Sequence, residues 1–209
     1  MKILLTAFEP FNGSSVNPSQ LILEKVTTLE DKILIKELLP VEFEKTSIRL
    51  KQLLQEYEPD IVLSLGQAGN RSEICVERVA INLNNVRSSD GKKVLADNAG
   101  ETPVDKIIKT DGATAYFSNL PVWDMVQAIQ SVGVKGAVSY SAGTYVCNHV
   151  MYTVLYEVTK YYPNMKAGFV HVPFLLEQWK EKQKNGNVQG YAMELEDMVR
   201  GIEAVLKIF

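Results

Sequence analysis

Residues 136–174, "GAVSYSAGTYVCNHVMYTVLYEVTKYYPNMKAGFVHVPF", decide the fold because they predict a strand, a helix and a second strand in succession. "GAVSYSAG" is typical of a strand that ends in a turn of small residues. "CNHVMYTVLYEVTKYY" predicts a helix, which Pro163 ends. "AGFVHVPF" predicts the next strand, so the unit is the building block of an α/β protein.

The rest of the chain repeats this alternation. We predict helices at 17–29, with Asn17 as cap and Pro18 at the first helical position, and at 43–57, 120–133 and 192–209. Strands are predicted at 2–8, 33–41, 61–65 and 78–86, and residues 87–113 form a polar surface loop. The pattern predicts one three-layer α/β/α domain over 1–209, with a mostly parallel twisted sheet, and ligands bound at the carboxyl ends of its strands.

Composition argues for an ordinary soluble protein. Of 209 residues, 46% are hydrophobic and 22% charged, and the formal net charge is −3. Such a charge gives no reason to expect nucleic acid as a partner, and no apolar run is long enough to cross a membrane. Two cysteines, Cys75 and Cys147, are too few for a disulfide framework, so we expect reduced thiols and a cytoplasmic protein.

Cys147 stands where a strand turns into a helix. The N–H groups at a helix N-terminus stabilise an anion, so a thiolate is favoured there and could act as a nucleophile. The alternative is a small buried residue, because cysteine is often found in cores. Cys75, in "RSEICVERV", has no helix start after it, and we interpret it as structural.

A thiol nucleophile needs a base and a group that orients the base. His149 lies two residues after Cys147 on the same helix, so the two side chains point about 200° apart. His171 is the better candidate, if its strand is a parallel neighbour that ends at the same sheet edge; otherwise it is a core histidine. Glu77 is the candidate carboxylate, against the alternative of a surface glutamate paired with Arg78.

Phosphate and metal sites have weaker support. "GQAGNR", with Gly66 and Gly69, allows a close backbone approach but matches neither common phosphate-binding loop. The cysteines and histidines lack the spacing of a metal site, so no metal is predicted. A thiol mechanism of this kind needs no cofactor, and none is predicted.

The chain resembles the pyroglutamyl peptidase I (pyrrolidone-carboxylate peptidase) family of cysteine peptidases over essentially its whole length. The resemblance is carried, in the family's order, by "LLTAFEPFNG", "NPS", "PDIVLSLGQAGNRSEICVERVAINLN", "AYFSNLPV", "SYSAGTYVCNHVMY" and "AGFVHVP". It implies a catalytic triad of Cys147, His171 and Glu77, with Arg87 and the Cys147 N–H binding the oxyanion. It implies substrate-binding roles for Phe8, Phe11, Gln67, Tyr145 and Val146, and Phe8 and Phe11 look exposed at the end of the first strand.

One loop departs from the family. "VRSSDGKKVLADNAG" holds about seven extra residues after Arg87. On that alignment Asp97 matches a family aspartate near the site, whereas Asp90 matches it if the insertion lies later.

The resemblance implies an exopeptidase that hydrolyses the amide bond after an N-terminal pyroglutamyl residue through an acyl-enzyme intermediate. Its partners would be pyroglutamyl peptides and other copies of itself, because the family is usually tetrameric; nucleic acid and membrane are not expected. Three alternatives stay open at this point: an inactive binding protein, a phosphate- or nucleoside-binding enzyme of phosphorylase-like fold, and a thiol redox protein.

Overall fold

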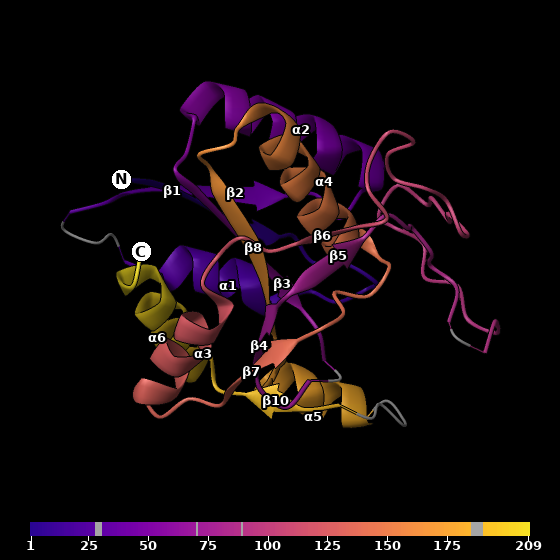
Figure 1. Ribbon diagram of the computed structural model, residues 1–209. Coiled ribbons are helices and arrows are strands. Elements are labelled where there is room, and N and C mark those ends of the chain that lie inside the picture. The colour runs from indigo at the N-terminus through magenta and orange to yellow at the C-terminus, as the bar shows by residue number, and fades with distance from the viewer. Residues whose placement is uncertain (28–30, 70, 89, 185–189) are drawn as a thin grey trace.

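Strands and helices alternate along most of the chain, as the sequence predicts (Figure 1). The computed structural model describes residues 1–209 except 28–30, 70, 89 and 185–189. The helices are α1 Pro18–Lys25, α2 Phe43–Tyr57, α3 Val122–Ser131, α4 Val146–Tyr161, α5 Leu176–Lys184 and α6 Leu195–Lys207. The strands are β1 Lys2–Phe8, β2 Ile33–Leu39, β3 Ile61–Gln67, β4 Ile74–Glu77, β5 Val79–Ile81, β6 Ala115–Phe117, β7 Gly136–Ser139, β8 Lys166–Val172, β9 Phe174–Leu175 and β10 Ala192–Met193.

Within the described residues, the main sheet has the strand order β2-β1-β3-β8-β4-β7. Its pairs are parallel except β4 with β8, which is antiparallel. β4 and β7 therefore run against the other strands. β1, β3 and β8 are buried along nearly their whole length, as expected for strands covered on both faces.

Helices cover both faces of the sheet and make the expected three layers. Apolar residues of α1, α3 and α6 pack against one face of the sheet, and those of α2 and α4 pack against the other. Figure 1 shows α2 and α4 together above the strands, with α1, α3 and α6 below them. The predicted three-layer, mostly parallel α/β fold is confirmed.

Several predicted boundaries are wrong. The helix predicted at 17–29 ends at Lys25, although Asn17 does cap it by accepting a hydrogen bond from the Ser19 N–H at 3.1 Å; position 29 lies outside the described residues. The single strand predicted at 78–86 is reduced to β5, which pairs with β6. The sequence analysis predicted no element for β4, α5, β6 or β9, each of which is short. The helix predicted from residue 192 begins only at Leu195, because residues 192 and 193 form β10.

None of the described helices combines the length and the apolar composition needed to cross a lipid bilayer.

Candidate active site

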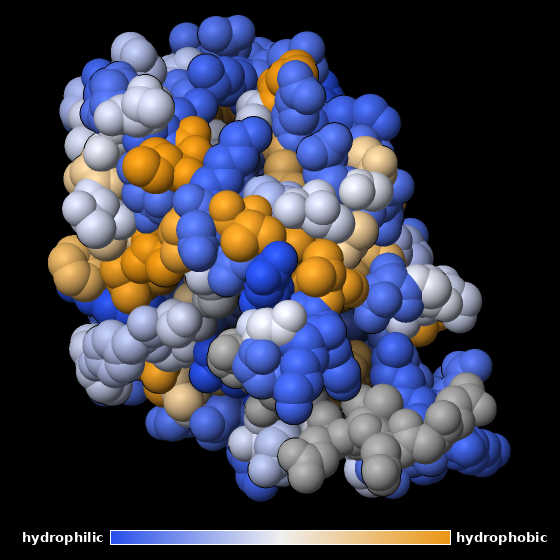
Figure 2. All heavy atoms as spheres, turned by 90° about the vertical axis from the view of Figure 1, so that its right-hand side faces the viewer, coloured by the Kyte–Doolittle hydropathy of each residue, from blue (hydrophilic) through white to orange (hydrophobic). Residues whose placement is uncertain are grey.

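A cavity of about 370 Å³ opens where β1, β3 and β8 end and α4 begins. Figure 2, which views the molecule from the right-hand side of Figure 1, shows apolar side chains across the middle of that face, bordered by polar ones. Both aromatic and polar side chains line the cavity: Phe8, Phe11, Asn17, Val41, Gln67, Ala68, Arg71, Leu95, Ser141, Ala142, Gly143, Tyr145, Val146, Cys147 and His171.

Cys147 is the second residue of α4 and is half-buried in this cavity. Among the described residues, the N-cap Tyr145 makes no side-chain capping hydrogen bond. The first N–H groups of α4 are therefore left for an anion at the cavity. Behind the sulfur lies the backbone of β3, because a Cβ added at Gly66 would stand only 2.9 Å from Cys147 Sγ. At Gly66 the lack of a side chain therefore makes room for the thiol.

His171 and Glu77 lie on neighbouring strands. In the antiparallel pair of β4 and β8, Cys75 is opposite His171 and Glu77 is opposite Phe169. Glu77 and His171 are therefore diagonal neighbours on one face of the sheet, which is within reach of long side chains. His171 Nδ1 and Glu77 Oε1 are 2.8 Å apart, and both side chains are buried. With Nδ1 engaged, the other ring nitrogen, Nε2, is left for the thiol.

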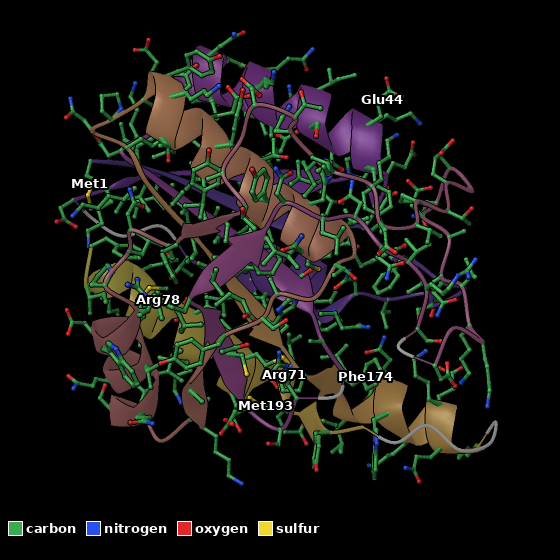
Figure 3. The ribbon with its side chains drawn as sticks, turned by 45° about the vertical axis from the view of Figure 1, so that its right-hand side comes forward. Met1, Glu44, Arg71, Arg78, Phe174 and Met193 are labelled. Carbon is green, nitrogen blue, oxygen red and sulfur yellow. The ribbon has the colours of Figure 1, made fainter. Side chains whose placement is uncertain are left out.

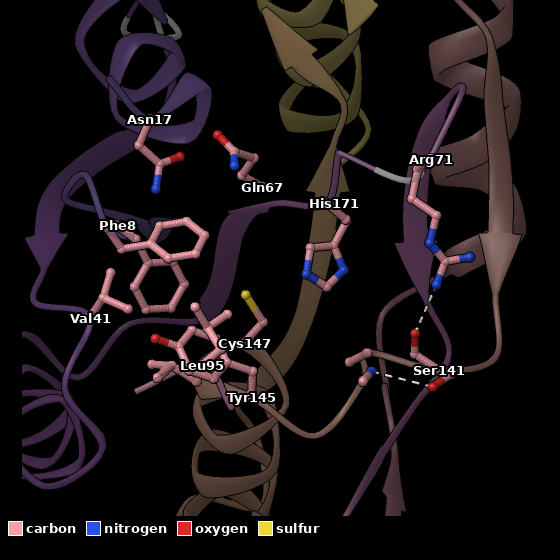
Figure 4. A pocket seen from close by; sticks show the side chains of 15 residues that line it. Phe8, Asn17, Val41, Gln67, Arg71, Leu95, Ser141, Tyr145, Cys147 and His171 are labelled. Carbon is pink, nitrogen blue, oxygen red and sulfur yellow. Dashed lines mark hydrogen bonds between the residues drawn. The ribbon is translucent and has the colours of Figure 1, made fainter. Parts of the chain in front are cut away.

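Charges around His171 favour the imidazolium. Burial lowers the pKa of His171, but the hydrogen bonds and negative charges of Cys147 and Glu77 outweigh it and raise the pKa to about 9. Figure 4 shows the Cys147 sulfur beside His171, with Phe8 and Tyr145 on the side away from Arg71. The structure thus brings together the three residues that the resemblance implies for the triad.

The predicted route to this arrangement is wrong. We expected the strand before Cys147 to be a parallel neighbour of the strand that carries His171. Instead β4 lies between β7 and β8, and β7 runs opposite to β8. Residues 140–145 connect β7 to α4. Because α4 packs against β8, the Cys147 thiol and the His171 imidazole come together.

The surface interpretation of Glu77 is also wrong, since its side chain is 0% exposed and Arg78 instead donates to the Ser118 carbonyl at 2.8 Å. Arg71 Nη2 is the guanidinium nitrogen near Glu77, 4.0 Å from Oε1. It also donates to Ser139 Oγ at 3.1 Å. Figure 3 shows Arg71 and Arg78 at separate places around the sheet.

The second histidine and the second cysteine lie outside the cavity lining. His149 Nε2 is 2.6 Å from Ser47 Oγ, and its Nδ1 contacts the Asn84 amide. Burial lowers the pKa of His149 to about 4, so the ring is neutral. Burial also raises the pKa of Cys75 to about 11, which suits the structural interpretation of this thiol.

The residues proposed to bind substrate all line the cavity: Phe8, Phe11, Gln67, Tyr145 and Val146. The expectation that Phe8 looks exposed is wrong, because it is 3% exposed and packs against Phe169 with ring centroids 6.3 Å apart. Phe11 is half-buried, and its ring centroid lies 6.0 Å from that of Tyr145. Phe8 thus belongs to the core and to the cavity wall at once.

Leu95 of the unusual loop lines this cavity, but the loop's candidate residues Arg87, Asp90 and Asp97 do not. Arg87 is exposed and lines a neighbouring hollow with Asn12 and Lys93. Asp97 is buried behind the cavity wall, where its oxygens accept hydrogen bonds from the N–H groups of Phe43, Ala99 and Glu101. Asp90 is exposed and accepts a hydrogen bond from the Lys92 N–H.

Sequence reasoning missed three polar residues of the cavity lining as functional candidates: Asn17, Arg71 and Ser141. Arg71 follows the Gly66–Gly69 turn, and its charge was the one available signal. Asn17 was identified as a helix cap, and it also lines the cavity while donating to the Glu9 carbonyl at 3.0 Å. In the described part of the chain, no group of three or more His, Cys, Asp and Glu residues is placed to hold a metal ion.

Comparisons with known proteins show which family the whole chain resembles. The family model described as "Pyroglutamyl peptidase" matches residues 1–208. A pyrrolidone-carboxylate peptidase of Streptococcus pyogenes serotype M12 (strain MGAS2096) is 44% identical over 207 residues, which cover 99% of this chain and 91% of the relative.

Solved structures are similar over the same length. Pyroglutamyl peptidase I from Bacillus amyloliquefaciens has a TM-score of 0.88 and 34% identity, covering 98% of this chain and 92% of its own. A mutant pyrrolidone carboxyl peptidase from the hyperthermophile Pyrococcus furiosus has a TM-score of 0.92 and 33% identity, covering 100% of this chain and 97% of its own. The chain belongs to the pyroglutamyl peptidase family.

Proposed function

We propose that the protein hydrolyses the amide bond after an N-terminal pyroglutamyl residue, as a cysteine peptidase. The observation that carries the proposal is that Cys147 and His171 line a cavity with largely apolar walls, while the buried Glu77 contacts His171 Nδ1 from behind. The pyroglutamyl ring is a neutral lactam without a free amine. Its binding calls for apolar walls and a few hydrogen-bonding groups, and needs no carboxylate to hold an ammonium group.

The first step is attack of the Cys147 thiolate on the carbonyl carbon that joins pyroglutamate to the next residue. The imidazolium of His171, which Glu77 supports through Nδ1, holds the proton that the thiol has released. The tetrahedral intermediate places its negative charge near the free N–H groups of the first turn of α4. Preorganised donors of this kind commonly supply the largest part of the stabilisation.

The intermediate collapses when His171 gives its proton to the departing amine. The sulfur is then joined to the pyroglutamyl group as a thioester. A water molecule, whose proton passes to the now neutral imidazole, attacks this thioester and releases pyroglutamate. Arg87 enters this scheme only as a predicted oxyanion donor, and its exposed position requires the loop after it to bring the guanidinium inward.

The proposal is tested by hydrolysis of a pyroglutamyl amide that carries a chromogenic leaving group, with and without iodoacetamide. We expect cleavage that iodoacetamide abolishes, and no cleavage of the matching prolyl amide, which lacks the lactam carbonyl. A folded protein that leaves the pyroglutamyl amide intact would refute the proposal. Binding of pyroglutamyl peptides without cleavage would then favour an inactive binding protein.

We also propose that the protein is a cytoplasmic homo-oligomer, a tetramer by analogy with the family. Free thiols at both cysteines suit a reducing compartment. Large aromatic side chains lie more than half exposed and could be covered by other copies of the chain: Phe117, Trp123, Tyr140 and Tyr161. Light scattering after size-exclusion chromatography measures the mass, and a monomer at micromolar concentration would contradict the proposal.

A further inference from the structure

Gln67 stands at the end of β3 and lines the cavity with its side-chain amide (Figure 4). An amide can present either an oxygen or an NH₂ group to a ligand, and the choice decides which ligand group fits. The hydrogen bonds around Gln67 settle this choice through Gln178, a residue of α5 that does not line the cavity.

The orientation of the Gln178 amide is fixed by the backbone. Its side chain is 5% exposed. Its Oε1 accepts a hydrogen bond from the Leu175 N–H at 3.4 Å, and its Nε2 donates to the Val16 carbonyl at 3.3 Å. Turning this amide over would set oxygen against oxygen at Val16 and N–H against N–H at Leu175. Both neighbours therefore favour the same orientation.

A fixed Gln178 fixes Gln67 in turn. Gln178 Nε2 also donates to Gln67 Oε1 at 3.0 Å, so the Gln67 oxygen is turned away from the cavity. Within the described residues, no hydrogen bond is donated by Gln67 Nε2. The group that Gln67 has left for a ligand is therefore a pure donor.

We propose that Gln178 is a positioning residue for substrate specificity: it holds the Gln67 amide so that the NH₂ group faces the ligand and selects a ring with a carbonyl oxygen. The inference rests on the proposed function, in which that acceptor is the lactam carbonyl of pyroglutamate. A proline ring has the same size and offers no oxygen there. It would leave the Gln67 donor without a partner, which is an effective way to reject an analogue.

The test uses two variants of Gln178 that differ in what they accept and donate. Gln178→Glu has no donor, so the Gln67 NH₂ group turns toward the new carboxylate and the Gln67 oxygen faces the lactam oxygen. Gln178→Met removes the hydrogen bond and leaves the Gln67 amide free to rotate. We expect kcat/KM for the pyroglutamyl amide to fall by about 10- to 100-fold in Gln178→Glu, the range for a mispaired buried polar group, and by less in Gln178→Met.

A double-mutant cycle separates positioning from general stability. In a Gln67→Met background no amide remains to be oriented, so either Gln178 substitution should change kcat/KM by at most about twofold more. Binding of 2-pyrrolidone, measured by calorimetry, should weaken in the same pattern without any turnover being required. Glu177→Gln, an exposed neighbour on α5, is the control and should match the wild type.

The outcomes are distinct. Equal losses with and without the Gln67→Met substitution, or no loss in Gln178→Glu, would overturn the inference. If Gln178→Glu fails to fold, the Gln178→Met cycle still decides. A wild type that binds 2-pyrrolidone with this Gln67-dependent pattern and cleaves nothing would refute the proposed function and leave the positioning role standing.

Discussion

Substituting Gly66 with alanine should disable the thiol while leaving the fold in place. A Cβ at this position would lie 2.9 Å from Cys147 Sγ and 2.7 Å from Phe169 Cζ, whereas ordinary contacts begin at 3.4 Å. The Gly66 backbone is not in the left-handed region, so the cost is purely one of space. The sulfur therefore has to retreat by about 0.5 Å or more, toward the cavity and off its line to His171.

The magnitude follows from the sensitivity of catalysis to position. A displacement of about 1 Å can cost about 100-fold in rate, so we expect kcat/KM to fall by about 10- to 100-fold. Overpacking should also lower the free energy of unfolding by about 1–3 kcal/mol. The assay is hydrolysis of a pyroglutamyl amide, with thermal unfolding measured on the same samples.

The control is Gly136→Ala, a crowded glycine of β7 that does not line the cavity. Its Cβ would lie 2.8 Å from Ile129 Cγ2, so stability should fall by a similar amount while kcat/KM stays near that of the wild type. A folded Gly66→Ala variant with wild-type kcat/KM would refute the reasoning, because the reacting sulfur could not then be packed against Gly66.

Three further predictions concern the triad. Glu77→Gln should lower kcat by about 1,000-fold or more, because the hydrogen bond to His171 Nδ1 at 2.8 Å loses the charge that supports the imidazolium. A folded variant with near-normal kcat would remove Glu77 from the mechanism. Iodoacetamide at neutral pH should label Cys147 and spare Cys75, whose pKa is raised to about 11 by burial, as mass spectrometry would show. In the same hydrolysis assay, Cys75→Ser should keep the activity that Cys147→Ser loses. Folding raises the pKa of His171 from 6.5 to about 9, so its contribution to stability is fully present below about pH 6.5 and disappears as the pH rises through about 9. The melting temperatures at pH 6 and pH 10 should accordingly differ more for the wild type than for His171→Asn, and equal differences in the two proteins would contradict the pKa assignment. The kcat/KM of the wild type should fall above about pH 9.

The sequence predicts the layers because long elements carry their own pattern. The apolar spacing of α2 and the continuous apolar run of β3 each indicate their type without reference to neighbours. The helix start at Cys147 is likewise a local signal, and the structure begins α4 only one residue earlier, at Val146.

What the sequence could not supply depends on contacts between distant residues. β4 is four residues long, too short for a periodic pattern, and only its pairing with β7 and β8 makes it a sheet strand. The antiparallel register that sets Glu77 beside His171 therefore had no local signal. Gln178 lies in a short helix of mostly polar composition, and its importance comes from partners at Val16 and Gln67.

The interior position of β4 and β8 in the main sheet has a consequence for hydrogen exchange. His171 and Glu77 sit on interior strands whose amide hydrogens should exchange with solvent only when the whole sheet opens. The cavity wall around Phe11 instead belongs to the irregular segment 9–17, tied down by contacts such as Asn98 Nδ2 to the Pro10 carbonyl at 3.1 Å. The amide hydrogens of that segment should therefore exchange with solvent without opening of the main sheet. Movement of this wall would then leave the hydrogen bond between His171 and Glu77 in place.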